Sequence, residues 1–354
     1  MKKALGAALA VSATLLVMSL GTGIAGTDGG HIEPRDGGFE LGEKFINFFF
    51  SGETSASISD FEVYVERDGQ TVTYSVFKLI EIESFYTTSV PVYDEMVYYV
   101  EGASGIARAH DIPMGTMSFQ TYVDNTISFE ISDEMGAISS DKSVVIGKDD
   151  FCADLVLLGS GSLTKAGQNI SIHMQPDDSF YFRTAYVYEN SIGRDIAEGR
   201  IAGELYLDIS IDTLAQAVVE YQPINMEVKS SSSSEIEIAV DASFPDGKTI
   251  ILTLEDAVFD VPLEELDVKL DGISVEKAEN VRAVIVSSDE SYYALEGNGV
   301  TQVFINIPHF SQRTIVLAGI GEVEEAGPDI ALGAVASLLL LVAATVFLFK
   351  RKDD

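Results

Sequence analysis

Alternation of apolar and polar residues with a period of two dominates this chain. Residues 61–65 alternate in this way, and residues 72–76 resume the pattern after Asp68-Gly69. Successive side chains of a strand point to opposite faces, so such segments predict half-buried β-strands. An Asp-Gly pair between two alternating runs predicts a hairpin, because both turn positions favour positive φ.

The same hairpin signal recurs further along the chain. It is found at Asp246-Gly247, Asp271-Gly272 and Asn298-Gly299. Helical patterns are short: residues 105–110 predict one turn, and residues 212–219 predict two turns with Asp212 as N-cap. The fold class expected is therefore all-β, built from sandwiches or barrels rather than from a parallel α/β sheet.

The strand pattern is interrupted at Gln222-Pro223, which predicts a domain boundary after residue 223. Residues 224–318 hold about seven short strands, the size of an immunoglobulin-like β-sandwich. Residues 39–223 form a larger β-rich extracellular region of one domain or two. We expect residues 26–38 to be a linker, and residues 319–329, which contain three glutamates, to be an acidic stalk.

Both ends of the chain carry membrane-targeting signals. Residues 1–25 combine a basic start with an apolar run and small residues, which predicts a secretory signal peptide; the alternative is an uncleaved N-terminal anchor, and in both cases the chain that follows is exported. Residues 330–349, from Ile330 to Phe349, are apolar or small over a length that spans a bilayer. The basic residues of the tail, 350–354, place it in the cytoplasm. The prediction is a single-pass cell-membrane protein with its N-terminal ectodomain outside.

The excess of acidic residues limits the kinds of molecule that the chain can bind. The chain has 56 acidic and 22 basic residues, a formal net charge of −34. Such a field repels nucleic acid and anionic lipid surfaces, so a nucleic-acid role is excluded. The remaining partners are the membrane itself, through residues 330–349, and other envelope proteins, glycans or cations.

Acidic pairs at expected loop ends are the candidates for a metal site. Asp149-Asp150 and Asp177-Asp178 could offer carboxylates to calcium, as could Asp133-Glu134, although none forms an EF-hand. No other cofactor is expected. Asn169 begins the only glycosylation sequon. The single cysteine, Cys152, lies in an apolar run and is predicted to be a buried, inert thiol.

Signatures of catalysis are missing from the sequence. The four histidines have no metal-ligand spacing, His173 is expected at the surface, and nucleophile-elbow, phosphate-loop and dinucleotide motifs are absent. Aromatic residues cluster at 45–50, 85–86, 93–99 and 180–188. They favour either core packing or an aromatic cleft for carbohydrate or peptide.

One C-terminal pattern resembles a known group of proteins. Residues 308–311 read Pro-His-Phe-Ser, close a β domain after the Val-Lys-Leu-Asp-Gly hairpin at 268–272, and precede a stalk and a terminal helix. Over roughly the last hundred residues this resembles membrane-anchored cell-surface proteins of methanogenic and related archaea. Some archaeal surface proteins carry a Pro-Gly-Phe sorting signal before the helix. Residues 326–329 depart from it, so we expect the helix to be retained.

These signals together predict a non-enzymatic surface protein with a binding, adhesion or envelope-structural role. The alternative is a tethered extracellular hydrolase that acts on glycans or peptides, with its site in the N-terminal region. A deep pocket with two facing carboxylates would favour the hydrolase, and filled sandwiches would favour the binding protein.

Overall fold

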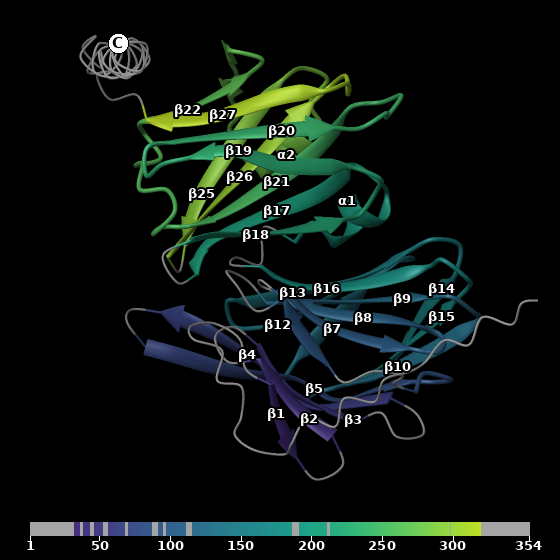
Figure 1. Cartoon of the computed structure of the whole chain (residues 1–354). Helices are drawn as coiled ribbons and strands as arrows, with labels where there is room; N and C mark the ends of the chain where they lie inside the picture. Colours follow the sequence, from purple (N-terminus) through teal and green to yellow (C-terminus); the bar gives the residue numbers. More distant parts are fainter. Residues whose placement is uncertain are drawn as a thin grey trace, which may run out of the picture.

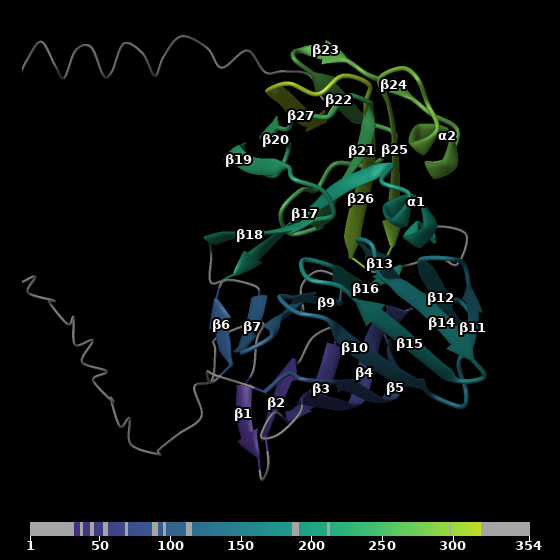
Figure 2. The same ribbon diagram turned by 90° about the vertical axis from the view of Figure 1, so that its right-hand side faces the viewer.

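The computed structural model describes residues 32–319, which form two β-sandwich units stacked on one another (Figures 1 and 2). The gaps in this description are residues 36–37, 43–45, 52–55, 68–69, 87–90, 95–96, 111–114, 186–190, 211–212 and 298. Residues 1–31 and 320–354 lie outside it, and with them the predicted signal peptide, transmembrane helix and tail. In the described part, neither helix has the length and apolar character needed to cross a bilayer. The predicted all-β fold class is confirmed.

The first unit consists of two eight-stranded sheets. One sheet has the order β1-β2-β3-β4-β5-β10-β15-β14. Its strands are β1 (Ile32–Arg35), β2 (Gly38–Gly42), β3 (Ile46–Ser51), β4 (Ala56–Arg67), β5 (Gln70–Ile82), β10 (Asn125–Ile131), β14 (Ser162–Ala166) and β15 (Asn169–Met174). The other has the order β11-β12-β13-β16-β9-β8-β7-β6. Its strands are β6 (Val92–Asp94), β7 (Val97–Gly102), β8 (Gly105–His110), β9 (Thr116–Thr121), β11 (Gly136–Ser139), β12 (Ser143–Lys148), β13 (Phe151–Leu158) and β16 (Ser179–Ala185).

Aromatic side chains fill the space between these two sheets. The ring of Phe182 on β16 meets Phe61 and Phe77 of the facing sheet edge to face, with centroids 5.1 and 5.3 Å apart. Phe129 and Phe180 pack in the same way at 5.3 Å. Phe180 and Phe182, from the aromatic cluster at 180–188, therefore belong to the core, as one of the two sequence interpretations proposed.

The second unit is a sandwich of a six-stranded and a five-stranded sheet. The first has the order β18-β17-β21-β26-β25-β24 and the second β19-β20-β27-β22-β23. The strands are β17 (Ile201–Ser210), β18 (Thr213–Glu220), β19 (Asn225–Ser231), β20 (Glu235–Asp241), β21 (Lys248–Glu255), β22 (Leu266–Leu270), β23 (Ile273–Ser274), β24 (Glu276–Lys277), β25 (Ser291–Gly297), β26 (Val300–Ile307) and β27 (Arg313–Gly319). The short helices are α1 (Gly193–Ala197) and α2 (Val281–Ile285).

The division between the units differs from the boundary expected after residue 223. Strand β17 pairs in parallel with β21, and Leu205 and Leu207 join the core of the second unit. Strand β18 pairs with β17, so both strands group with the C-terminal sheets. The parallel pairing of β17 with β21, which aligns Ile201 with Thr249, leaves no mark in the local pattern. The expected linker 26–38 is also partly a strand, because β1 pairs with β2.

Three of the four predicted hairpins connect paired strands. The signal at 68–69 lies between β4 and β5, which pair with each other, as do β22 with β23 and β25 with β26. Asp271 and Gly272 have φ of 51° and 81°. The prediction at Asp246-Gly247 was wrong, because β20 and β21 lie in different sheets. Gly247 is needed there for a different reason: a Cβ would lie 2.8 Å from the Cα of Pro308.

Both segments predicted to be helical turns are strands. Residues 105–110 form β8 between β7 and β9, and residues 213–220 form β18 beside β17. Such short segments fit either period, and pairing with neighbouring strands decides their conformation.

Candidate functional site

The outer face of the second sheet of the first unit meets the second unit. Residues of adjacent strands lie opposite one another in three rows across this face. The first row is Val97, His110, Thr116, Arg183 and Asp154; the second is Tyr99, Arg108, Ser118, Tyr181 and Val156; the third is Glu101, Ile106, Gln120, Ser179 and Leu158. We call the first the sealed row, because Arg183 and Asp154 in it are buried, and the second the open row. Val97, His110 and Thr116 of the sealed row also line the cavity that the open row borders. Side chains that lie opposite one another on neighbouring strands are within contact distance, so each row is a continuous line of neighbouring side chains across the sheet.

The sealed row carries a buried cluster of charges. Arg183 is 1% exposed, and Asp154 and Glu204 are fully buried. The Nε of Arg183 lies 2.9 Å from Oε1 of Glu204 on β17, and its NH1 lies 3.9 Å from Oδ2 of Asp154. The Arg183–Glu204 contact is an ion pair without hydrogen-bond alignment. This pair joins the two units across their junction, because Arg183 belongs to the first and Glu204 to the second.

Asp154 also anchors the chain where it enters the second unit. Its carboxylate accepts hydrogen bonds from Ser191 Oγ at 2.6 Å and from the backbone N–H of Ile192 at 3.1 Å, just before α1. Burial raises the pKa of Asp154, and the Arg183 guanidinium opposes this shift. The cause is that one buried cation faces two buried carboxylates, so an ionised Asp154 would leave a net negative charge away from water.

Tyr206 and His110 lie next to the buried charges of the sealed row. The hydroxyl of Tyr206 donates a hydrogen bond to Oε2 of Glu204, and its ring centroid lies 4.6 Å from that of His110. Burial and the Glu204 carboxylate raise the pKa of Tyr206 well above its ordinary value. Tyr206 therefore stays a neutral donor that holds Glu204 in place.

Apolar contacts surround this polar cluster. Val156 of β13 packs in one apolar cluster with Ile192 at the N-cap of α1 and with Ile196 of that helix. Ile201 and Phe304 of the second unit belong to the same cluster. The two units thus share a buried junction made of side chains from both.

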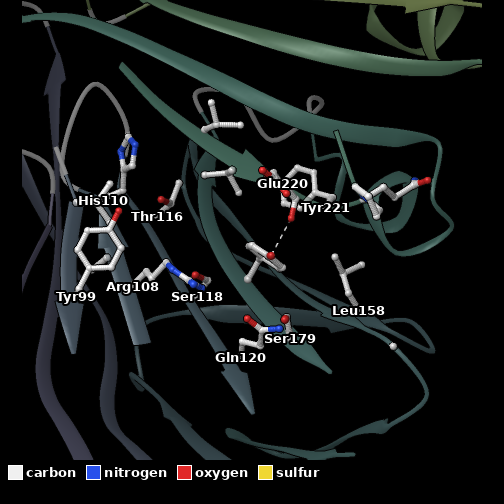
Figure 3. A pocket seen from close by; sticks show the side chains of 18 of the residues that line it. Tyr99, Arg108, His110, Thr116, Ser118, Gln120, Leu158, Ser179, Glu220 and Tyr221 are labelled. Carbon is white, nitrogen blue, oxygen red and sulfur yellow. Dashed lines mark hydrogen bonds between the residues drawn. The ribbon is translucent and has the colours of Figure 1, made fainter. Parts of the chain in front are cut away.

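The open row borders a cavity of about 570 Å³ between the units. Its floor is the sheet face of the first unit, with Arg108, Ser118 and Gln120, and its roof is the end of β18 with the following residues to Pro223. Figure 3 shows the labelled side chains, with Tyr99, Arg108 and Ser118 on one side and Glu220 and Tyr221 on the other. This volume is in the range of small-molecule binding sites.

Tyrosines shape the wall of this cavity. The hydroxyl of Tyr181 donates to the backbone carbonyl of Glu220 at 2.8 Å, and the rings of Tyr181 and Tyr221 meet edge to face at 5.1 Å. Burial raises the pKa of Tyr181, and the nearby Arg108 charge opposes this shift. The lining therefore combines aromatic faces, hydroxyl and amide groups, and a guanidinium, which suits the binding of a polar ligand.

An acid pair for hydrolysis would need two carboxylates about 5 to 10 Å apart across the cavity. The lining contains two acids, Asp177 from the turn before β16 and Glu220 from the end of β18. They are the residues through which the hydrolase alternative can be tested.

The predicted calcium ligands do not come together. Asp149 and Asp150 lie at the start of β13, whereas Asp177 and Asp178 lie beside the end of this strand, where Leu158 pairs with Ser179. In the described residues, no group of three His, Cys, Asp or Glu side chains could hold a metal ion. The Asp133-Glu134 pair instead makes ion pairs with Lys78 and Lys148.

Asp178 has a structural role in the turns near the cavity. Its carboxylate accepts hydrogen bonds from the backbone N–H groups of Ser160, Gly161 and Gln175 at 2.8 to 2.9 Å. It is buried, and Asp177 has a φ of 70°. Asp178 thereby ties the turn after β13 to the turn before β16.

Other predicted residues stand as follows. Asn169 is exposed at the start of β15, as glycosylation requires, and the modification itself stays a prediction. His173 is exposed, as expected. Cys152 is buried, which confirms that prediction, and burial raises the pKa of its thiol to about 12.

Sequence reasoning missed the charged cluster and offered a cleft only as one of two interpretations of the aromatic clusters. A usable signal was present for the cluster, because Asp154 interrupts an otherwise apolar strand and Glu204 lies among the apolar residues of the first half of β17. A charge in such a position is seldom buried without a partner. For the cavity, the aromatic clusters at 93–99 and 180–188 allowed a cleft as one of two interpretations, and Tyr99 and Tyr181 do line it. Its remaining lining comes from strands far apart in the chain, which no local pattern brings together.

Comparisons with known proteins give no assignment. No protein-family model matches the chain, and neither does any curated protein. Among solved structures, a family 81 glycoside hydrolase from Clostridium thermocellum is 10% identical over 82% of this chain, with a TM-score of 0.33. The match spans 34% of that hydrolase. The N-terminal domain of a Streptococcus gordonii adhesin is 10% identical over 86% of this chain and 85% of its own, with a TM-score of 0.18.

Proposed function

We propose that this chain is a membrane-anchored extracellular protein without enzymatic activity that binds glycans in the cavity at the junction of its two units. In this proposal the C-terminal unit is an immunoglobulin-like sandwich held near the bilayer by residues 330–349, as in the archaeal surface proteins that the sequence resembles. The observation that carries the binding role is the polar and aromatic cavity beside the open row.

The floor of the cavity favours a glycan over a peptide. Strands β8, β9 and β16 are interior strands of their sheet, and their backbone groups already pair with neighbours. Peptides in extended form are commonly recognised by adding a strand at an open sheet edge, which this floor does not offer. Tyr99, Tyr181 and Tyr221 instead present amphipathic rings, and Ser118 and Gln120 present groups that match sugar hydroxyls.

Filling the cavity tests this role. We would measure the binding of neutral and acidic oligosaccharides to the full-length chain in detergent by isothermal titration calorimetry. Ser118→Trp places a large side chain on the floor and is expected to abolish binding. Thr73→Trp, at an exposed position of β5 on the facing sheet, is the matched control and should bind normally. Binding that survives in Ser118→Trp would contradict the assignment of the site.

Release of shortened products during the same titration would favour the hydrolase instead. In that case Asp177→Asn and Glu220→Gln should abolish product formation while the sugar still binds. Topology is tested by treating intact cells with protease: peptides from residues 39–318 should be released without lysis, and their recovery only after lysis would contradict the extracellular placement.

A further inference from the structure

Arg108 is an exception among the basic residues of this acidic chain. Every other lysine and arginine side chain that the structure describes has a carboxylate or a backbone carbonyl oxygen as partner. No described residue offers such an oxygen to the guanidinium of Arg108. Yet this side chain is half-buried on the floor of the cavity, on β8.

The neighbours of Arg108 in the open row do not neutralise it. Tyr99 lies opposite it on β7 and Ser118 opposite it on β9, and both are uncharged. The next residue in the row, Tyr181, already donates its hydroxyl to the carbonyl of Glu220. A guanidinium has five N–H donors in a planar fork, which matches the two oxygens of a carboxylate.

We propose that the junction cavity selects an acidic sugar, with the sugar carboxylate bound by Arg108. This inference rests on the glycan-binding role proposed above and specifies the ligand class. The hydroxyl of Ser118 and the rings of Tyr99 and Tyr181 flank the guanidinium on the same strip. They are placed to contact the hydroxyl groups and the apolar face of the sugar ring that carries the carboxylate.

The net negative charge of the chain adds to the preference for a ligand with a single, well-placed carboxylate. A net charge of −34 repels anions at long range, so only a ligand that reaches Arg108 with a well-placed carboxylate gains from its charge. Densely sulfated or phosphorylated polymers carry many charges that find no cation here. The expected ligand therefore has single carboxylates spaced along a polyhydroxylated chain.

A matched pair of sugars tests the proposal. One is a disaccharide that contains glucuronate, and the other is the same disaccharide with the carboxylate reduced to the neutral alcohol. Calorimetry on the full-length chain should show at least tenfold tighter binding of the acidic sugar. Arg108→Gln should remove this preference and keep the weak binding of the neutral sugar. Arg108→Lys should retain part of it, because lysine keeps the charge and loses the planar fork.

Arg313→Gln is the control, since Arg313 lies on β27 of the second unit and pairs with Asp271. It should leave both affinities unchanged, and an unchanged thermal midpoint of Arg108→Gln shows that the fold persists. Equal binding of the two sugars by the unmodified chain would overturn the acidic preference and leave the glycan role standing. Binding of neither sugar would overturn both proposals, and preference for a peptide with a free C-terminal carboxylate would overturn the sugar assignment.

Discussion

Two arginines on the same sheet face have opposite environments. Arg183 in the sealed row is 1% exposed and pairs with Glu204 of the second unit. Arg108, two strands away in the open row, is half-buried beside the cavity and has no acidic partner in the described residues. Neighbouring rows are two residues apart along a strand, about 7 Å. Between Arg183 on β16 and Arg108 on β8, the junction changes from a filled contact to an open site.

The comparison shows what the second unit contributes. Where β17 and α1 cover the sheet, every charge has a partner in the other unit or at the helix entrance. Where β18 ends and the chain continues to Pro223, the cover stops and the floor stays accessible. The sealed row thus holds the units in one arrangement, and this arrangement gives the cavity its roof.

The largest effect is expected when the arginine of each row is replaced. Arg183→Met should lower the free energy of unfolding by about 3–5 kcal/mol, because it leaves Glu204 buried without its cation. Arg108→Met should change it by less than about 0.5 kcal/mol. Urea unfolding followed by circular dichroism measures both. Adding Glu204→Gln to Arg183→Met should restore part of the loss, and similar losses for the two single variants would remove the distinction between the rows.

A smaller loss is expected from crowding the sealed side. A Cβ at Gly193 of α1 would lie 2.8 Å from Oδ1 of Asp154. Gly193→Ala should therefore cost about 1–3 kcal/mol in spite of the better helix propensity of alanine. Gly136→Ala is the control, since its nearest contact, the carbonyl oxygen of Gly147, would be 3.4 Å away. The urea unfolding midpoints of the two variants are compared. An unchanged free energy of unfolding for Gly193→Ala would mean that the side chains of the junction can shift to accept the added methyl group.

The pH dependence of stability should report the sealed carboxylate. The folded chain binds the proton of Asp154 more tightly than the unfolded chain, because folding raises the pKa of this carboxyl group. The resulting contribution to the free energy of unfolding is complete below the ordinary pKa of 3.8 and is lost as pH rises through the folded-state pKa. Asp154→Asn should therefore flatten the decline of stability with rising pH.

Asp271 should show the opposite pH dependence. Burial raises its pKa, but hydrogen bonds from Thr314 and Arg313 lower it overall. The unmodified chain should therefore lose stability on acidification at this residue, and Asp271→Asn should remove that loss. Thermal midpoints at stepped pH test both, and parallel curves for Asp154→Asn and the unmodified chain would contradict the first.

The smallest effect concerns salt and the open row. Added salt screens the long-range repulsion by the −34 charge more than the direct contact at Arg108, so the affinity for the acidic disaccharide should rise. The Debye length falls from about 30 Å at 0.01 M to about 8 Å at 0.15 M, and we expect a two- to threefold gain over this range. The neutral disaccharide provides the reference. An affinity for the acidic sugar that falls with salt would show that attraction dominates at long range.

The sequence predicted local features well where one segment decides them. The Asp271-Gly272 turn follows from the need for positive φ, and the burial of Cys152 follows from its apolar surroundings. Residues 105–110 and 212–219 were assigned wrongly, because a short segment that fits two periods takes its conformation from the strands beside it. The acidic pairs at 149–150 and 177–178 were separate calcium candidates, and in the described residues neither belongs to a group of three His, Cys, Asp or Glu side chains that could hold a metal ion. A sequence shows which acids are adjacent in the chain, but not which further ligands the fold brings to them.

The sequence by itself determined that the described chain is all-β and strongly acidic, and that it turns at Asp271-Gly272. These properties depend on side-chain period, charge and local φ preferences, which neighbouring residues set. Only the tertiary structure decided that β17 and β18 join the second unit, that Arg183 meets Glu204, and that Arg108 is left beside a cavity. Such contacts join residues far apart in the chain, and their energies depend on burial that no single segment specifies.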